Sequence, residues 1–544
     1  MDAVVTSIDD VLARLRSTEI AGDEPVAVAM RTAGVRFAAV GGTLGERWRD
    51  ALRELGDCIR PIAGSTDVLN EGGVYRGSWL ESTGTINAEL LSRFVPEVTR
   101  DTHLLFARQQ RHDGMLPYKV TDDGPGFSQI QIVTPLARTV WNHYLLGGRD
   151  ADYLRTMYDA MARYDDWLAT YRDTRGTGAV EAFCTFDTGH DLSPRFWFVP
   201  DRGYGGDARR FDPASPVLPY IAPDLTANVA CQRAYLALIA DELGLDPAPW
   251  REKATVSLGA LFTQCFDEND AIFYDRDSAG AMVAIQSDVL LRVLACEVGD
   301  AHFFTATLGR YLMNTTKFLA HYGFTSLAMD DPRFDHDYTR NSWGGPSNFL
   351  SLIRAPHAFE HHGHVAELAL TAMPVLAAVA ASDRFPQCLD PWTGAAGFTT
   401  AYSPSILWLL DAIERHSGIL PRPDGELWFS GLIPTRLDHG TAAAATGYAR
   451  TIDGIGYELV GDDEAVVVYR DGIEHLRFPR GWRVITDRAG TVTAVVGLAA
   501  VAVSGELGAN GDPVPLTVLP NERIAITDGV VGERATPGFV GPRF

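Results

Sequence analysis

One short stretch of the chain, residues 181–198, combines residue types that together could bind and cleave a sugar. Within it lie five aromatic rings, two aspartates, a glutamate and an arginine. Aromatic faces stack on the apolar faces of pyranose rings, while carboxylates and arginine hydrogen-bond the hydroxyls at the ring edges. A carboxyl group among aromatic rings also has its pKa raised by desolvation, as a general acid at neutral pH requires. Asp191 is the candidate for that acid. The alternative is a polar turn that enters a helix, with Asp191 and Ser193 as local caps.

The overall composition limits the partners that such a site can serve. The chain has 544 residues, and its hydrophobic fraction of 46% is typical of a folded globular protein. Its net charge at pH 7 is -23. That charge repels phosphate backbones and anionic membranes, so we expect no nucleic acid and no membrane as partner. The small-molecule carbohydrate substrate is expected to be neutral or to be recognised locally. The N-terminal residues lack the features of a signal peptide, and no stretch is as long as a membrane span. These features predict a cytoplasmic protein of unknown oligomeric state.

The cysteines give no sign of a metal or redox centre. None forms a pair with two intervening residues, and their spacing fits no metal-binding pattern. We therefore expect buried free thiols, no metal ion and no cofactor. The six cysteines are Cys58, Cys184, Cys231, Cys265, Cys296 and Cys388.

Most of the chain has the hydrophobic period of helices, and these helices would carry the loops of such a site. In residues 152–171, five apolar side chains from Leu154 to Leu168 share one helix face. Residues 223–243 begin with proline and aspartate and end before Gly244, as helices commonly do. Further helices are predicted near residues 46–57, 84–110, 132–147, 248–266, 283–298, 301–322, 362–381 and 403–416.

After about residue 420, apolar and polar residues alternate and β-branched side chains are frequent, which predicts strands. The predicted strands are residues 464–469, 482–486, 491–503, 516–519 and 523–527. The predicted fold is therefore mainly α, with a small antiparallel β domain at the C-terminus. Its predicted parts are an N-terminal lead-in at residues 1–43, a helical catalytic domain at residues 44–420 and a sandwich-like β domain at residues 421–544.

One class of glycosidase has motifs that several stretches of this chain resemble. The sequence DTGHDLSPRF at residues 187–196 resembles the segment that carries the general acid in trehalases and in glycoside hydrolase family 63. Asp191 stands at the position of that acid. The resemblance implies an (α/α)6 toroid, and about twelve helices with long, aromatic-rich loops fit that barrel. It also implies hydrolysis of a small, α-linked glycoside or oligosaccharide by an inverting general acid and general base.

Other stretches match motifs of the same family in the same order and together cover about residues 70–420. They are GGVYRGSWLES at residues 72–82, HDGMLP at 112–117, SQIQIVTP at 128–135, APDLTAN at 222–228, YGFTS at 322–326, SWGGP at 342–346, FPQCLDPWTG at 385–394 and YSPSILW at 402–408. Their shared order is a stronger signal than any single stretch. Two positions depart from the family pattern. Glu81 replaces an aspartate, and Gly344 replaces an arginine, which removes a bidentate contact.

The most important departure is Gln387, which stands where the family pattern has its basic glutamate. A carboxamide cannot take a proton from water. Three interpretations are open: an inactivated form that keeps the shape of the site, a different carboxylate as base, or a protein that binds sugar without cleaving it. The other carboxylates considered are Asp390, Glu360 and Glu81. The otherwise intact pocket chemistry favours the inactivated form.

In the inverting scheme, Asp191 protonates the glycosidic oxygen while a base at position 387 of an active form activates water across the sugar ring. The two carboxyl groups of such enzymes stand roughly 6.5 to 9.5 Å apart. The predicted catalytic positions are therefore Asp191 and Gln387. For each predicted tryptophan contact, core packing is an equal alternative to stacking on sugar. The predicted sugar contacts are Trp79, Glu81, Asp187, Arg195, Trp343 and Trp392.

A histidine-rich stretch at residues 357–364 leaves two further alternatives. Its residues His357, Glu360 and His361 fit a short zinc-peptidase pattern, but no downstream ligand set follows, so a polar loop that lines a pocket is preferred. The same histidines keep open an (α/α)6 sugar epimerase, which uses a pair of histidines as acid and base. A non-catalytic carbohydrate-binding protein is the last alternative. Gln387 favours it, and the complete acid motif disfavours it.

Overall fold

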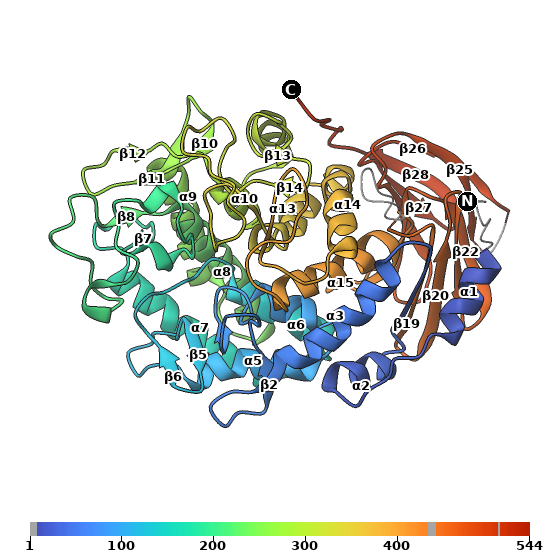
Figure 1. The fold of residues 1–544 in the computed structure, drawn as a ribbon, viewed down its shortest axis with the longest axis horizontal. Helices are drawn as coiled ribbons and strands as arrows, with labels where there is room; N and C mark the ends of the chain where they lie inside the picture. Colours follow the sequence, from blue (N-terminus) through green and yellow to red (C-terminus); the bar gives the residue numbers. More distant parts are fainter. Residues whose placement is uncertain (1–7, 433–441, 510–511) are drawn as a thin grey trace.

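The computed structural model describes residues 8–432, 442–509 and 512–544, in which a helical body lies beside an antiparallel β region (Figure 1). The connections of the helical body contain the short turns η1 (Thr185–Asp187), η2 (Pro194–Phe196), η3 (Tyr204–Gly206) and η4 (Leu308–Leu312). The α-helices are α1 (Ile8–Ser17), α2 (Pro25–Thr32), α3 (Leu44–Cys58), α4 (Ile86–Leu91), α5 (Pro96–Arg108), α6 (Leu136–Leu146), α7 (Ala151–Tyr171), α8 (Pro223–Glu242), α9 (Ala248–Cys265), α10 (Val289–Leu294), α11 (Ala301–Thr307), α12 (Phe349–Leu352), α13 (Ala355–His361), α14 (Val365–Ala381) and α15 (Ser403–Ser417).

Short strands of two or three residues join the loops between these helices. They form small antiparallel sheets, whose backbone hydrogen bonds tie neighbouring loops together. These strands are β2 (Ile59–Pro61), β3 (Asp67–Leu69), β4 (Ser78–Trp79), β5 (Lys119–Thr121), β6 (Gly124–Gly126), β7 (Glu181–Ala182), β8 (Tyr220–Ile221), β9 (Phe266–Asp267), β10 (Ile272–Phe273), β11 (Asp275–Arg276), β12 (Met282–Val283), β13 (Leu319–Ala320), β14 (Gly323–Phe324), β15 (Ser347–Asn348) and β16 (Cys388–Leu389).

The helix predictions hold best where the periodic pattern is long. The two clearest predictions, residues 152–171 and 223–243, correspond to α7 and α8. The single helix predicted at residues 84–110 is instead two helices, α4 and α5, because Pro96 begins α5 and the residue before a proline avoids helical geometry. Residues 283–298 form only the short helix α10, because residues 282–283 belong to β12.

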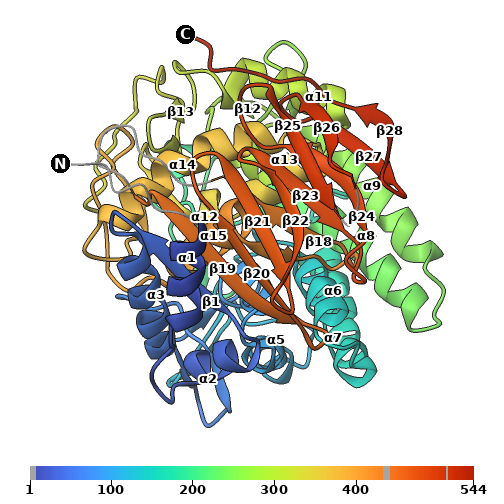
Figure 2. The same cartoon turned by 90° about the vertical axis from the view of Figure 1, so that its right-hand side faces the viewer.

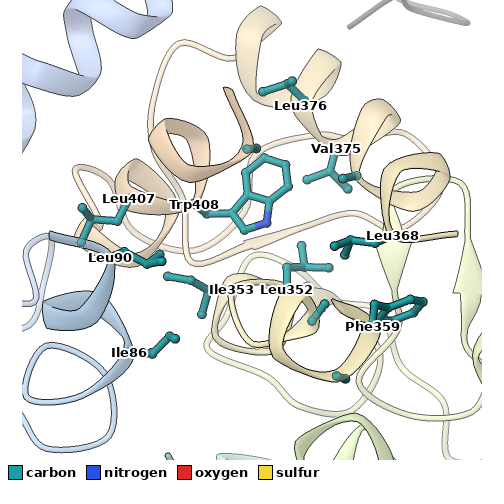
Figure 3. Close-up of a cluster of buried hydrophobic side chains, with 14 of the residues drawn as sticks. Ile86, Leu90, Leu352, Ile353, Phe359, Leu368, Val375, Leu376, Leu407 and Trp408 are labelled. Carbon is teal, nitrogen blue, oxygen red and sulfur yellow. The ribbon is translucent and has the colours of Figure 1, made fainter. Parts of the chain in front are cut away.

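Large apolar side chains from α4, α12, α13, α14 and α15 converge in the core of the helical body. Figure 3 shows the indole of Trp408 among side chains from neighbouring helices, including Leu352 and Val375. The three side chains are 5%, 5% and 0% exposed, and burying a side chain of this size stabilises the fold by about 1.5–3 kcal/mol. This core holds the start of α15 in place, and Tyr402, which directly precedes α15, lies at the site described below.

The C-terminal region consists of two antiparallel sheets whose inner faces share one hydrophobic core (Figure 2). The rings of Phe429 and Tyr457, one from each sheet, lie 5.5 Å apart. The predicted antiparallel β region is thereby confirmed, although the predicted strand at residues 491–503 is divided between β24 and β25. One sheet has the order β1-β19-β20-β21-β22-β25-β26, and the other has the order β17-β18-β23-β24-β27-β28. Their strands are β1 (Arg36–Val40), β17 (Ile419–Pro421), β18 (Leu427–Ser430), β19 (Ala445–Ile452), β20 (Ile455–Gly461), β21 (Ala465–Arg470), β22 (Ile473–Pro479), β23 (Trp482–Thr486), β24 (Val492–Gly497), β25 (Val503–Ala509), β26 (Val514–Val518), β27 (Arg523–Thr527) and β28 (Val530–Ala535).

The N-terminal segment joins the β region. Strand β1 pairs antiparallel with β19, so that Arg36 lies opposite Ala449 and Val40 opposite Ala445. Helix α1 packs on the same sheet, where Val11 contributes to a small core with Val460. The lead-in therefore supplies an edge strand to the C-terminal sheet. The boundaries at residues 43 and 420 stay predictions.

A buried ionic cluster links the helical body to the β region. Arg93, which follows α4, contacts Asp411 at 2.6 Å and Glu414 at 3.0 Å on α15, and Arg450 on β19 pairs with Glu414. All four side chains are almost fully buried, so each charge depends on its partners to offset the loss of hydration. Among the described residues, none of the helices combines the length and apolar character needed to cross a bilayer.

Candidate active site

A cavity of about 240 Å³ lies among the loops of the helical body. It is smaller than the roughly 300–1,000 Å³ of sites for drug-sized ligands, so its size suits a single sugar ring. Its wall is rich in aromatic rings, carboxyl groups and carboxamides, which are the groups that stack on a pyranose and hydrogen-bond its hydroxyls. The residues that line it are Glu71, Tyr75, Trp79, Glu81, Tyr118, Lys119, Gln129, Gln131, Phe186, Gly189, Asp191, Arg202, Asn341, Leu350, Gln387 and Tyr402.

Three local structures bring these distant residues together. Strand β4 pairs with β5, which sets Trp79 opposite Lys119. Strand β15 pairs with β16, so Gln387, which directly precedes β16, lies opposite Phe349, whose amide donates to the Gln387 backbone carbonyl oxygen at 2.9 Å. Between them, the loop from η1 to η2 carries the Asp191 side chain to the cavity.

Asp191 has the environment that a general acid requires. Burial of its carboxyl group raises the pKa to about 8, and the charges of Glu81 and Asp201 act in the same direction. The backbone carbonyl of Asp191 accepts a hydrogen bond from the Trp343 amide at 3.0 Å. The next residue, Leu192, has a φ of 59°, a conformation that costs non-glycine residues of order 1–3 kcal/mol and that often occurs at functional sites.

The Asp191 carboxyl group faces the cavity, whereas its neighbour Ser193 caps the turn η2 by accepting a bond from the Arg195 amide. The local capping role considered for this turn is therefore filled by Ser193. The side chain of Asp191 is left available to a ligand.

A chain of hydrogen bonds connects Asp191 to Gln387. The Asn341 amide donates to the Asp191 carboxyl at 2.6 Å, and the Gln387 amide donates to the Asn341 carbonyl oxygen at 2.9 Å. The Tyr75 hydroxyl donates to the Gln387 carbonyl oxygen at 2.7 Å. Since one amide group separates the first two bonds, the Asp191 carboxyl and the Gln387 carboxamide are no more than about 8 Å apart.

Glu81 lies on the cavity wall beside the acid. Gln131 donates to its carboxylate at 2.5 Å, and the guanidinium groups of Arg292 and Arg354 stand 3.9 and 3.8 Å away. Burial raises the pKa of Glu81, while the two arginines oppose that change. Gly189 approaches Glu81 so closely that a Cβ there would lie 2.5 Å from the carboxylate oxygens, which explains why glycine stands two residues before Asp191.

Of the eight predicted site residues, the structure brings Asp191, Gln387, Trp79 and Glu81 to the cavity wall. Two of the other four lie behind the loop that carries Asp191 and hold it in place. Asp187 is fully buried, pairs with Arg172 at 2.6 Å and accepts the amides of residues 130, 183 and 184. The Arg195 guanidinium is paired with Asp224 and Asp275.

The remaining two predicted contacts are tryptophans that do not line the cavity. Trp343 is 1% exposed and packs against His190, with a ring separation of 4.7 Å. Trp392 is 46% exposed and packs against His336. Trp343 therefore has the packing role that was considered as an alternative, and Trp392 lies on the surface.

Twelve of the sixteen wall residues were not predicted as site residues, and four of them stand out: Glu71, Tyr75, Asn341 and Tyr402. Burial raises the pKa of Glu71 to about 7, with a further increase from the charge of Glu81. The Tyr75 ring meets the Trp79 ring edge to face and the Tyr402 ring at a tilt, with ring centres 5.7 and 5.8 Å apart. Each of the four lies within or next to a recognised motif, and that proximity was the one signal in the sequence that could have indicated them.

Two of the alternative bases considered for this site are engaged elsewhere. The Asp390 carboxylate accepts the amides of Trp392 and Thr393 and caps a turn. Glu360 is bound by Arg415 at 2.5 Å and by Arg422 at 3.3 Å, and it lines a different cavity.

The histidine-rich stretch is dispersed among separate partners. His357 contacts Glu89 at 3.1 Å, His362 contacts the carbonyl oxygen of Ala358 at 2.8 Å, and His364 contacts Glu367 at 3.1 Å. In the described part of the chain, no three His, Cys, Asp or Glu side chains are grouped to hold a metal ion. No histidine is among the described residues of the 240 Å³ cavity, so nothing at this site favours the epimerase. All six cysteines are buried and free.

Comparison with known proteins places the chain in a family. Residues 76–405 match the mannosylglycerate hydrolase MGH1-like glycoside hydrolase domain, and this match covers more than half of the chain. The chain belongs to the mannosylglycerate hydrolase MGH1-like family of glycoside hydrolases. This membership confirms the resemblance inferred from the motifs, and Asp191 and Gln387 both lie within the matched residues. No curated protein matches the sequence.

Solved structures of family 63 and trehalase proteins share the fold. A GH63 mannosylglycerate hydrolase from Thermus thermophilus, in complex with Tris and D-glycerate, is 20% identical with a TM-score of 0.57; the match covers 67% of this chain and 99% of that one. The neutral trehalase Nth1 from Saccharomyces cerevisiae is 14% identical with a TM-score of 0.50, over 64% of this chain and 73% of that one. At these identities the likeness concerns the fold of the glycoside hydrolase domain.

Proposed function

We propose that this glycoside hydrolase removes a single sugar from a small glycoside with inversion of the anomeric configuration, and that Asp191 is its general acid. The observation that carries the proposal is a carboxyl group with a pKa of about 8 on the wall of a cavity that suits one sugar ring. Such a carboxyl group stays protonated near neutral pH and can donate its proton to a glycosidic oxygen. The limit of about 8 Å between Asp191 and position 387 is compatible with the spacing of inverting enzymes.

In this reaction the sugar ring stacks on the aromatic wall near Trp79, and its hydroxyls bond to Glu81 and Gln131. Asp191 transfers its proton to the leaving oxygen as the bond from that oxygen to the anomeric carbon breaks. A water molecule attacks the anomeric carbon from the opposite face, so the product has the inverted configuration. Asn341 holds the Asp191 carboxyl group in one orientation during the transfer.

We also propose that the leaving group carries a carboxylate, as glycerate does. Two cationic side chains line the cavity, Lys119 and Arg202, and neither forms an ion pair with a carboxylate of the described residues. The ammonium group of Lys119 instead stands 5.3 Å from the ring centre of Trp79. Unpaired cations beside a sugar site attract an anionic partner, and a structural relative has been solved with D-glycerate bound.

The fold proposed for the helical body is an (α/α)6 toroid between about residues 44 and 420. The likeness to the family 63 and trehalase structures supports it, since the family match at residues 76–405 lies within these limits. In such a toroid the loops at one end of the helices form the sugar site. The loops that carry Asp191 and Gln387 are of this kind.

The test is hydrolysis of α- and β-linked glucosyl and mannosyl derivatives of glycerate and of glycerol, with the product anomers followed by NMR. We expect cleavage of a glycerate glycoside with inversion, a loss of about 100- to 10,000-fold in kcat for Asp191→Asn, and no change for the exposed control Asp123→Asn. Lys119→Gln and Arg202→Gln should raise KM for the glycerate compound and leave the glycerol compound unaffected. Retention of configuration, or full activity of Asp191→Asn, contradicts the proposal.

A further inference from the structure

Two carboxyl groups on the cavity wall, those of Asp191 and Glu71, have no cationic side chain within salt-bridge distance among the described residues. The other buried carboxylates of the described residues contact arginine, lysine or histidine, as Asp187 contacts Arg172 and Glu367 contacts His364. A buried carboxylate without a cation costs several kcal/mol. Proteins tolerate this cost at functional sites, because a carboxyl group in a cleft whose pKa is shifted often takes part in the chemistry.

Glu71 is 3% exposed, yet it lines the cavity. Its carboxylate accepts the hydroxyl groups of Ser82 and Tyr402, which orient it without neutralising it. Its own carbonyl oxygen accepts the Ser403 amide at 2.9 Å, and its amide donates to Gly77 at 2.9 Å. The side chain is therefore held rigidly, as a group that must receive a proton from a positioned water requires.

The backbone of Glu71 is tied to the segment that carries position 387. The backbone of Glu71 is bound to residue 403, and the neighbouring Gly72 pairs with Tyr402. Tyr402 in turn donates its amide to the carbonyl oxygen of Phe385, two residues before Gln387. Glu71 thus stands on the wall that carries position 387. Glu81 lies against the loop of Asp191, because a Cβ at Gly189 would be 2.5 Å from its carboxylate oxygens, while the neighbouring Ser82 donates its hydroxyl to Glu71.

Both ends of the Gln387 carboxamide are hydrogen-bonded to neighbouring side chains. Its oxygen accepts the Tyr75 hydroxyl, and its amide group donates to Asn341, which itself donates to Asp191. This arrangement makes Gln387 a positioning residue that fixes Asn341 and Tyr75. It has no basic lone pair on nitrogen and no charge with which to take a proton from water.

We propose that Glu71 is the general base of this enzyme. It replaces the glutamate that the family pattern has at position 387, where this chain has Gln387. The inference rests on the hydrolysis proposed above. Glu71 takes one proton from the attacking water as the water oxygen bonds to the anomeric carbon. The electron pair of the breaking glycosidic bond goes to the leaving oxygen, which receives the proton of Asp191. Glu71 ends protonated and Asp191 ionised, and exchange with solvent restores both.

The experiment compares the unchanged chain with Glu71→Gln, Gln387→Glu and the matched control Glu54→Gln on the same panel of glycosides. Glu54 is a half-buried glutamate of α3, outside the cavity, whose pKa is likewise raised by burial. We expect kcat to fall about 100- to 10,000-fold in Glu71→Gln, to stay unchanged in Glu54→Gln and not to rise in Gln387→Glu. The acid limb of the pH profile, near pH 7 from the Glu71 pKa, should disappear with Glu71→Gln.

A second variant separates the loss of a base from the loss of the fold. Glu71→Ala in the presence of azide should recover turnover and give a glycosyl azide of inverted configuration, because azide attacks without losing a proton. Full activity of Glu71→Gln overturns the inference and leaves the proposed hydrolysis standing. If Gln387→Glu hydrolyses a glycoside and the unchanged chain hydrolyses none, the inference is also overturned. That result supports the interpretation that Gln387 marks an inactivated form of the enzyme. If neither the unchanged chain nor any variant hydrolyses any of the glycosides, the proposed hydrolysis is contradicted, and the inference is contradicted with it.

Discussion

At the scale of single residues, the site is defined by which carboxyl groups are paired. Asp187 and Asp191 lie in the same motif, but Asp187 is bound by Arg172 and backbone amides, whereas Asp191 has only the Asn341 amide. The first therefore stabilises the loop. The second is left with a pKa near 8 because burial disfavours its charge.

The raised pKa of Asp191 predicts a pH-dependent cost to stability. The folded state binds this proton more tightly than the unfolded state, whose pKa is about 3.9, so stability is lost as the pH rises from about 4 to about 8. Asp191→Asn removes that loss. We expect its Tm to match that of the unchanged protein near pH 4 and to exceed it by a few °C at pH 8.5.

Thermal unfolding of Asp191→Asn at a series of pH values checks this prediction. The exposed Asp123→Asn should show no pH-dependent difference. A constant offset between Asp191→Asn and the unchanged protein at every pH would mean that the Asp191 carboxyl group is not desolvated in the fold.

At the scale of elements, the site depends on close contact between two loops far apart in the sequence. Gly72 has a φ of +85°, and a Cβ at this position would lie 2.2 Å from the carbonyl oxygen of Ala401. This contact sets Glu71 and Tyr75 against the segment that ends at Tyr402. The short pair of β15 and β16 then holds Gln387 beside Asn341.

Gly72→Ala should separate these two loops and so damage the site. We expect a loss of at least about tenfold in kcat/KM, since small misplacements of positioned groups cost up to about a hundredfold. Gly64→Ala is the matched control, because Gly64 also has a positive φ, +77°, but no atom lies within 4 Å of its Cβ position. Gly64→Ala should cost about 1 kcal/mol of stability and leave kcat/KM unchanged. Steady-state kinetics of Gly72→Ala and Gly64→Ala measure this difference in kcat/KM, and equal values for the two variants would contradict the prediction.

At the scale of the whole molecule, the β region is built from both ends of the chain and is tied to the helical body. Strand β1 joins the sheet of β19, and Arg450 of β19 reaches Glu414 of α15. One hydrophobic core continues from the helices into both sheets. We therefore expect the two regions to unfold together.

Arg450→Met tests this coupling. It leaves the buried Glu414 with less compensation, so the free energy of unfolding should fall by about 3–5 kcal/mol. The exposed pair of Arg16 and Glu458 provides the control, because Arg16→Ala should cost less than about 1 kcal/mol. Calorimetry should show a single transition for all three proteins. A separate early transition of the β region in Arg450→Met would contradict the coupling.

The sequence by itself determined the features that depend on neighbours along the chain. Periodic apolar residues predicted α7 and α8, alternating residues predicted the C-terminal strands, and ordered motifs predicted the family and indicated Asp191 as the proposed acid. These signals are local, so a single chain contains them in full.

Only the tertiary structure decided which of these residues meet. The pairing of β1 with β19 joins residues about 400 positions apart, and no local pattern encodes such a contact. The same holds for the site. Arg195 and Asp187 have the residue types of a sugar site but are engaged in buried ion pairs, whereas Glu71 was passed over and has no cationic partner among the described residues. Whether a carboxylate is paired or free depends on which distant side chains fold against it, and for that reason Glu71 became visible only in the folded protein.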